Sequence, residues 1–171
     1  MMNDLPQRKH PRLKHYDYGK NGCYFVTICT KKRARMFGHI VGRDALIPPM
    51  IRIPPQIKLT AVGEIVQKYI NNISIVYDGI NVDRYVIMPD HVHLLISINR
   101  PFEQNGGMRA SRPTLQTIVL SLKTMVTKEL GYSMWQDSFF ERVIRNEKGY
   151  LDIWKYIDEN PAEWRGEGIY D

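Results

Sequence analysis

The order of predicted elements indicates an α+β protein with a ferredoxin-like β-α-β-β-α-β sandwich, in which two helices cover one face of an antiparallel sheet. Strand-like runs rich in β-branched and aromatic residues alternate with two amphipathic segments of helical period. Two of the strands are separated only by the turn dipeptide Pro89-Asp90, which favours a hairpin. The 171 residues suffice for one domain, and 43% hydrophobic with 25% charged residues is ordinary for a globular protein.

The first half of the chain supplies a strand, a helix and the start of the hairpin. The run CYFVTICT at 23–30 is rich in strand-forming residues. Prolines interrupt the next stretch, 31–59, so it accommodates short edge strands but no helix. Thr60 is the predicted N-cap of a helix, and strands at 81–88 and 91–98 follow it.

The second half repeats the alternation and adds one helix. A loop at 100–113 leads to Thr114, the predicted N-cap of a helix that reaches Leu130. A strand at 138–145 completes the sheet, and a final helix at 147–159 follows. The apolar residues of this last helix share one face: Tyr150, Ile153, Trp154 and Ile157.

Composition limits the class of protein. No apolar run reaches the length of a membrane span and no signal peptide opens the chain, so we expect a cytoplasmic protein that does not interact with membranes. Cys23 and Cys29 lie six residues apart in one predicted strand, about 20 Å, which is too far for a disulfide. We therefore expect free thiols. A basic arm over 1–20 precedes a single domain over 21–171.

Positive charge is concentrated near the N-terminus. The net charge is +6, and residues 1–35 hold nine lysines and arginines against two aspartates. Such a segment suits a nucleic-acid backbone, although a solvated basic tail has the same composition. The candidate DNA-binding residues are Arg8, Lys9, Arg12, Lys14, Lys31, Lys32 and Arg33, with Arg109 and Arg112 in the 100–113 loop. A solubilising role for that loop is an equal alternative.

Two histidines begin the predicted strand HVHLLISI. His91 and His93 are two residues apart, so both side chains point to one face of the sheet, with Cβ atoms about 6–7 Å apart. Two imidazoles at this spacing can converge on one cation. A pair of histidines on a strand also has an ordinary structural interpretation, and a structural zinc site would need four ligands that this chain does not bring together.

The final helix offers two further groups to the same site. Tyr156 lies about 110° from the centre of the apolar face, where its hydroxyl can stay accessible. Asn160 lies one turn further on the same side, and Pro161 is predicted to end the helix there. Two imidazoles and an amide oxygen form a possible ligand set for a divalent cation. Taken singly, such a tyrosine is more often a half-buried aromatic than a nucleophile, and an asparagine before proline is by default a helix stop.

Together these motifs resemble the REP-associated tyrosine transposases, which belong to the single-tyrosine HUH transposases. RYVIMPDHVHLLISI, WQDSFFERVIRNEKGYLDIWKYIDENPAEW and the opening RLKHYDYGKNGCYFVTICTKKRARMFGHI carry the resemblance, from about residue 12 to 165. It implies cleavage and rejoining of single-stranded DNA beside a hairpin, with Tyr156 as the nucleophile that forms a 5′-phosphotyrosine. It also implies Mg²⁺ or Mn²⁺ on His91, His93 and Asn160. Asp90 and Glu159 stand where similar sequences often carry asparagine, and each is a further candidate ligand.

Several alternatives remain open at this point. The same fold could serve as a non-catalytic binding module for single-stranded nucleic acid, or as a domesticated relative that serves its host. A monomer and a homodimer that exchanges the tyrosine helix are equally compatible with the sequence. Four aromatic residues are candidates for stacking on unpaired bases: Tyr16, Tyr18, Phe102 and Trp135.

Overall fold

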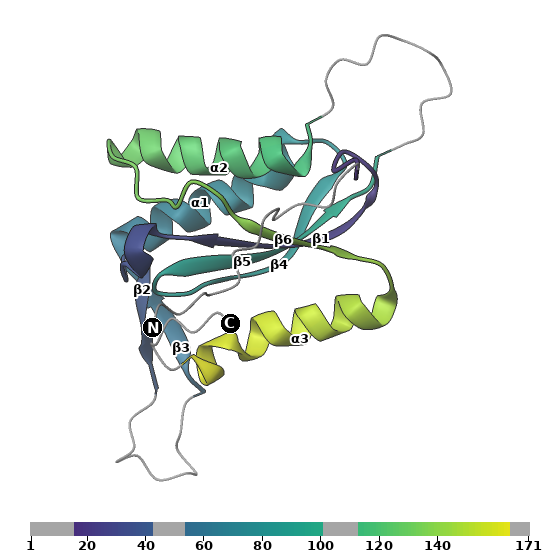
Figure 1. The fold of residues 1–171 in the computed structure, drawn as a ribbon. Coiled ribbons are helices and arrows are strands. Elements are labelled where there is room, and N and C mark those ends of the chain that lie inside the picture. Colours follow the sequence, from purple (N-terminus) through teal and green to yellow (C-terminus); the bar gives the residue numbers. More distant parts are fainter. Residues whose placement is uncertain (1–15, 43–53, 101–112, 165–171) are drawn as a thin grey trace, which may run out of the picture.

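Four antiparallel strands form the central sheet, in the spatial order β4-β5-β1-β6 (Figure 1). The computed structural model describes residues 16–42, 54–100 and 113–164 of the chain. The four strands are β1 (Gly22–Cys29), β4 (Ile80–Ile87), β5 (His91–Ile98) and β6 (Phe140–Ile144). Chain neighbours β4 and β5 form the predicted hairpin, and β1 lies between β5 and β6. This order is the ferredoxin-like arrangement predicted from the sequence.

Two helices cover one face of the sheet, as predicted. They are α1 (Ala61–Val76) and α2 (Leu115–Leu130), which pack side by side (Figure 1). The side chains of Thr60 and Thr114 accept hydrogen bonds from the backbone N–H groups of Gly63 and Thr117, at 3.2 and 3.3 Å. Both predicted N-caps are therefore confirmed, because each hydroxyl satisfies a donor that the first helical turn leaves unpaired.

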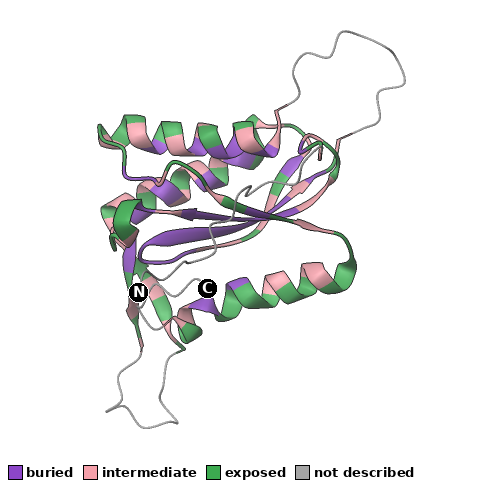
Figure 2. Ribbon diagram, viewed as in Figure 1, coloured by how far each residue is buried: buried purple, intermediate pink, exposed green. Residues whose placement is uncertain are grey.

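The main core lies between the sheet and these two helices. Buried residues follow the inner faces of the elements, while outward positions stay exposed (Figure 2). Alternate residues of β1 and β5 enter this core because strand side chains alternate between faces. Its fully buried members include Tyr24, Val26, Ile28, Val92, Leu94, Ile96, Val66, Ile70, Ile118 and Val126.

The third helix, α3 (Glu147–Glu163), covers the opposite face of the sheet (Figure 1). A smaller apolar cluster of Phe25, Leu95 and Ile157 lies beneath it, flanked by the predicted apolar face of the helix. The predicted end before Pro161 is wrong, because the helix continues to Glu163. Proline removes one backbone donor, but the buried Ile157 and Asn160 hold the last turns against the sheet, and the N–H of Trp164 bonds to the carbonyl of Asn160.

A small two-stranded sheet lies at one end of the molecule. It pairs β2 (Gly38–Val41) with β3 (Gln56–Leu59), after a short 3₁₀ turn, η1 (Lys31–Arg33). These are the short edge strands expected of the proline-rich stretch. The N–H of Phe37 bonds to the carbonyl of Pro89 at 2.9 Å, so this segment is tied to the turn that precedes the two histidines.

Two of the proposed stacking residues are part of the packing instead. Tyr18 and Trp135 are only 7% and 2% exposed, so the prediction that their rings stack on bases is wrong. Tyr16 packs on the same core with its ring against Tyr18, but it is only partly buried, and its proposed stacking stays a prediction. Phe102 lies outside the described residues. Tyr16 and Tyr18 also show that the packed domain begins before residue 21.

Other sequence predictions are confirmed with small shifts. Strand boundaries move by one or two residues, and the sulfur atoms of Cys23 and Cys29 are free thiols. Within the described ranges, no helix is long and apolar enough to cross a membrane.

Candidate functional site

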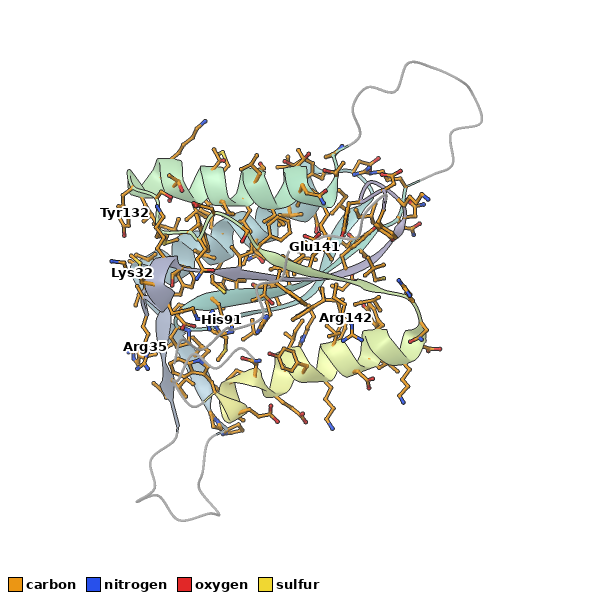
Figure 3. The ribbon with its side chains drawn as sticks, viewed as in Figure 1. Lys32, Arg35, His91, Tyr132, Glu141 and Arg142 are labelled. Atoms are coloured by element: carbon orange, nitrogen blue, oxygen red, sulfur yellow. The ribbon has the colours of Figure 1, made fainter. Side chains whose placement is uncertain are left out.

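Strand β5 places the two histidines side by side under the C-terminal half of α3. His91 lies opposite Cys29 of β1 and His93 lies opposite Thr27. Their Nε2 atoms are 3.1 Å apart, and both side chains are almost fully buried. His91 is seen on the α3 side of the sheet in Figure 3. The prediction that the two imidazoles converge is confirmed.

A hydrogen-bond partner occupies the far nitrogen of each ring. The Asp90 carboxylate lies 2.6 Å from Nδ1 of His91, and the Thr27 hydroxyl lies 2.8 Å from Nδ1 of His93. The Arg33 guanidinium, which only donates, also approaches this Nδ1 at 3.3 Å, but the Asp90 carboxylate, which only accepts, is closer. The shorter contact favours the tautomer in which Nδ1 of His91 carries the proton and its Nε2 presents a lone pair. Such outer contacts set the tautomer and orientation of metal-binding histidines.

Burial favours the neutral form of both rings. It lowers the pKa of His91, although the hydrogen bond from its ring to Asp90 acts in the opposite direction. Burial also lowers the pKa of His93 well below the ordinary value, with the neighbouring His91 and Arg33 adding to the effect. Neutral imidazole is the form that binds a metal ion.

Arg33 closes the other side of this polar cluster. Its guanidinium forms an ion pair with Asp90 at 3.1 Å and donates to Sγ of Cys29 at 2.7 Å. Lys32 and Arg33 both have φ of 54°, a left-handed conformation that turns the chain sharply after β1. Arg33 therefore binds Asp90, the carboxylate that contacts His91. A contribution of Arg33 to DNA binding stays a prediction.

Helix α3 brings Tyr156 to the histidine pair. Its hydroxyl lies 3.4 Å from Nε2 of His93, and its ring meets the His93 ring at 5.2 Å between centroids. Tyr156 is still 36% exposed, so it lies at the surface beside the buried histidines. The predicted position at the flank of the apolar face is confirmed.

Two polar contacts between α3 and β4 stabilise the position of the helix on the sheet. The Tyr150 hydroxyl donates to Asp83 at 3.1 Å, and Arg84 forms an ion pair with Asp158. Asp83 lies at a β-bulge, where the pairing of β4 with β5 shifts between Val82 and Arg84. The bulge allows neighbouring residues of β4 to reach toward α3.

Asn160 lies one helical turn beyond Tyr156 on the same side of α3 and is 7% exposed. It is not at a frayed helix end, as the sequence predicted, but within the continuous helix. In the described residues no group of three or more His, Cys, Asp or Glu side chains that could hold a metal ion is found. The prediction that Asn160 is a metal ligand therefore stays a prediction, and Glu159, the residue before it, is exposed and pairs with Lys155.

Apart from Arg33, the predicted basic residues divide into two groups. Lys31 and Lys32 are exposed on η1, beside the end of β1 that faces His91. Figure 3 shows Lys32 and Arg35 at this end of the molecule. The others, Arg8, Lys9, Arg12, Lys14, Arg109 and Arg112, lie outside the described residues.

Sequence reasoning missed Thr27, Phe25 and Asp83. Phe25 stacks on His93 at 5.1 Å and meets the edge of Tyr156 at 5.9 Å. The sequence signal for Thr27 and Phe25 is their spacing of two in the first strand, which places both on one face. Their partners become apparent only when the pairing of β1 with β5 is known.

Three comparisons show which known proteins this chain is similar to. The family model described as IS200-like transposase matches residues 20–160. An uncharacterized protein of Haemophilus influenzae is 33% identical over 182 aligned positions, which cover 97% of this chain and 94% of that protein. A solved structure of a REP-associated tyrosine transposase bound to a REP hairpin has a TM-score of 0.58 at 18% identity, covering 89% of this chain and 73% of that one. This likeness supports the fold.

Proposed function

The chain belongs to the IS200-like transposase family, and we propose that it cleaves and rejoins single-stranded DNA with Tyr156 as the nucleophile. The approach of the Tyr156 hydroxyl to His93, at 3.4 Å, carries this proposal. The site thus combines an exposed tyrosine, the proposed nucleophile, with two buried, neutral imidazoles whose Nε2 atoms converge.

The donor set fits a divalent cation, Mg²⁺ or Mn²⁺. Two ligands bound at about 2.1 Å and at right angles are about 3.0 Å apart, close to the 3.1 Å between the two Nε2 atoms. Without a cation or a proton between them, two lone pairs at this distance repel. His91 and His93 would hold the ion with Asn160 as third ligand, and a bound ion would polarise the scissile phosphodiester.

Tyr156 would perform the covalent step by transesterification. Its oxygen forms a bond to phosphorus as the bond from phosphorus to the 3′-oxygen breaks, which leaves a 5′-phosphotyrosine. The phenolic proton passes to solvent water, which reaches this half-exposed side chain, and the departing 3′-oxygen takes up a proton. Attack by another 3′-hydroxyl reverses the step and joins new ends, and no ATP is needed because the number of phosphodiester bonds is unchanged.

The proposed substrate is single-stranded DNA beside a hairpin. The solved relative is bound to a REP hairpin, and Lys31 and Lys32 supply exposed positive charge next to the histidine pair here. Basic side chains at this position would hold the phosphates that lead to Tyr156.

A covalent-adduct assay tests the nucleophile. Labelled single-stranded oligonucleotides that contain repeat hairpins are incubated with the protein and Mn²⁺, then run on a denaturing protein gel. We expect a labelled band with wild type and with Tyr132→Phe, an exposed tyrosine far from the histidines, and none with Tyr156→Phe. An adduct with Tyr156→Phe would identify another nucleophile. Tight hairpin binding without any adduct would favour the non-catalytic or domesticated binding module.

Thermal unfolding with and without Mn²⁺ tests the metal ligands. A ligand at 100 times its dissociation constant stabilises the native state by about 2.7 kcal/mol. We expect Mn²⁺ to raise the melting temperature of wild type and of His39→Ala, which changes an exposed histidine on β2, but not of His91→Ala or His93→Ala. Equal Mn²⁺ effects in all four proteins would contradict the proposed ligands.

A further inference from the structure

Two side chains of β6 point to the same face of the sheet as the histidine pair. Phe140 lies opposite Thr27 and Arg142 lies opposite Phe25 in the pairing of β1 with β6. Since Thr27 binds His93 and Phe25 stacks on it, this face is the α3 side of the sheet. Glu141, between the two, is buried on the other side, and Figure 3 shows Arg142 and Glu141 pointing to opposite faces.

Phe140 extends the row of aromatic rings that begins at the proposed nucleophile. Its ring meets Phe25 edge-on at 6.4 Å, and Phe25 meets Tyr156 edge-on at 5.9 Å. Phe140 is 36% exposed, as is Tyr156, whereas Phe25 between them is 7% exposed. The row therefore has a covered centre and two accessible ends on one surface.

The position of α3 leaves this surface accessible. The helix packs mainly against β4 and β5, toward the opposite edge of the sheet from the edge strand β6. The edge-on contact with Phe25 contributes to the buried portion of the Phe140 ring. The exposed portion is apolar area next to a proposed DNA-cleaving site, and an unpaired base can cover it by stacking.

Arg142 adds a cation to this surface. Its side chain is exposed, and it makes no ion pair or hydrogen bond with the described residues. It lies two residues from Phe140 on the same face, the spacing at which one nucleotide offers both a base and a phosphate. Arginine binds phosphate oxygens in a forked geometry.

We propose that Phe140 and Arg142 form a binding subsite for one unpaired nucleotide of the DNA strand beside the cleavage point. The base stacks on Phe140 and the phosphate binds the Arg142 guanidinium. This inference rests on the proposed function, because it states where the strand lies once its scissile phosphate reaches Tyr156. Stacking tolerates any base, so the subsite positions the strand and does not read its sequence.

Binding measurements with abasic oligonucleotides test the stacking. In a Tyr156→Phe background, where no adduct forms, hairpin oligonucleotides lacking one base at successive flanking positions are titrated against the protein. We expect Phe140→Leu to weaken binding of the intact oligonucleotide by roughly 5- to 150-fold. At one flanking position, we expect loss of the base to weaken binding to the parent protein but not to the Phe140→Leu variant. Binding to the Phe140→Trp variant should still be weakened by loss of that base, because tryptophan can also stack on it.

Salt dependence tests the phosphate contact separately. For single strands, each phosphate contact contributes about 0.7 to the slope of log affinity against log salt. We expect Arg142→Gln to reduce this slope by about that amount, while Phe140→Leu leaves it unchanged. Lys128→Gln, an exposed cation in the last turn of α2, and Tyr132→Leu are the matched controls and should behave as the parent protein. Circular dichroism verifies that all variants fold.

The outcomes separate this inference from the proposed function. Suppose that wild type forms the covalent adduct, but that removal of each base weakens binding to Phe140→Leu by the same factor as binding to the parent protein. The proposed subsite is then wrong, and the proposed function stands. If the single-position dependence is seen but no adduct forms, the subsite holds in a protein that binds without cutting. An unchanged salt slope in Arg142→Gln would overturn the assigned phosphate contact.

Discussion

The hydroxyl of Tyr156 lies 3.4 Å from Nε2 of His93 in the same polypeptide. Helix α3 folds back over the sheet of its own chain, held by the contacts of Tyr150 with Asp83 and of Arg84 with Asp158. Within one chain, the proposed nucleophile therefore reaches the histidine pair without an exchange of the tyrosine helix.

This arrangement predicts that the enzyme acts in cis. Tyr156→Phe and His93→Ala, each inactive alone, should stay inactive when mixed, because neither protein contains both groups. The adduct assay on the mixture measures this, with wild type at half concentration as the positive control. Restored adduct on the His93→Ala chain would show that the tyrosine helix is exchanged.

Asp90 should tune the affinity for the metal. Its carboxylate orients His91 through a 2.6 Å contact and is buried beside Arg33. Loss of such an outer partner costs about 10- to 100-fold in metal affinity, so we expect Asp90→Ala to weaken Mn²⁺ binding by that factor in calorimetric titrations. Asp152→Ala, which removes an exposed carboxylate on α3, is the control. Complete loss of Mn²⁺ binding would instead identify Asp90 as a direct ligand.

Tyr150 should make the fold sensitive to alkaline pH. Burial and the neighbouring Asp83 raise the pKa of Tyr150 to about 12, while the unfolded chain ionises near pH 10. Between these values the unfolded state has already lost a proton that the native state retains. The contribution of the protonated Tyr150 hydroxyl to the free energy of unfolding is therefore complete below pH 10 and is lost as the pH rises toward 12.

Tyr150→Phe should reduce this alkaline loss. At neutral pH we expect the variant to be less stable by about 1 kcal/mol, because one hydrogen bond is missing. Urea unfolding from pH 7 to pH 12 compares it with wild type, and Tyr132→Phe is the exposed control. Identical pH dependence in Tyr150→Phe and wild type would contradict the prediction. Burial also raises the pKa of Tyr24, so some alkaline loss should remain in the variant.

Gly63, the single glycine of α1, should not tolerate replacement by a larger residue. A methyl group at this position would lie 2.0 Å from the carbonyl oxygen of Phe37, where the backbone after η1 crosses the start of the helix. We expect Gly63→Ala to destabilise the protein by about 3 kcal/mol or more in urea unfolding.

The comparison variant is Gly131→Ala. Gly131 ends α2 with φ of 79° and has no atom within 4 Å of an added methyl group, so only the backbone conformation opposes the change. We expect a cost of about 1 kcal/mol. A Gly63→Ala variant as stable as Gly131→Ala would mean that the Phe37 backbone moves aside easily.

Local patterns in the sequence were enough to predict the elements of this fold. The N-caps Thr60 and Thr114, the hairpin around Pro89-Asp90 and the common face of His91 and His93 depend on residues close in the chain, so each could be recognised from spacing alone. Pro161 is the exception. Its local preference to end a helix is outweighed by the burial of neighbouring residues against the sheet.

The tertiary structure alone decided how the site is assembled. The pairing of β1 with β5 brings Thr27 to His93, the packing of α3 brings Tyr156 to the same ring, and the turn after β1 brings Arg33 to Asp90. The same packing buries two of the aromatics that the sequence had suggested for stacking, Tyr18 and Trp135, and leaves Phe140 at the surface. The sequence determined which residues share a strand or helix face, because that depends on local period. Which faces meet depends on contacts between residues far apart in the chain, and these form only when the whole core packs.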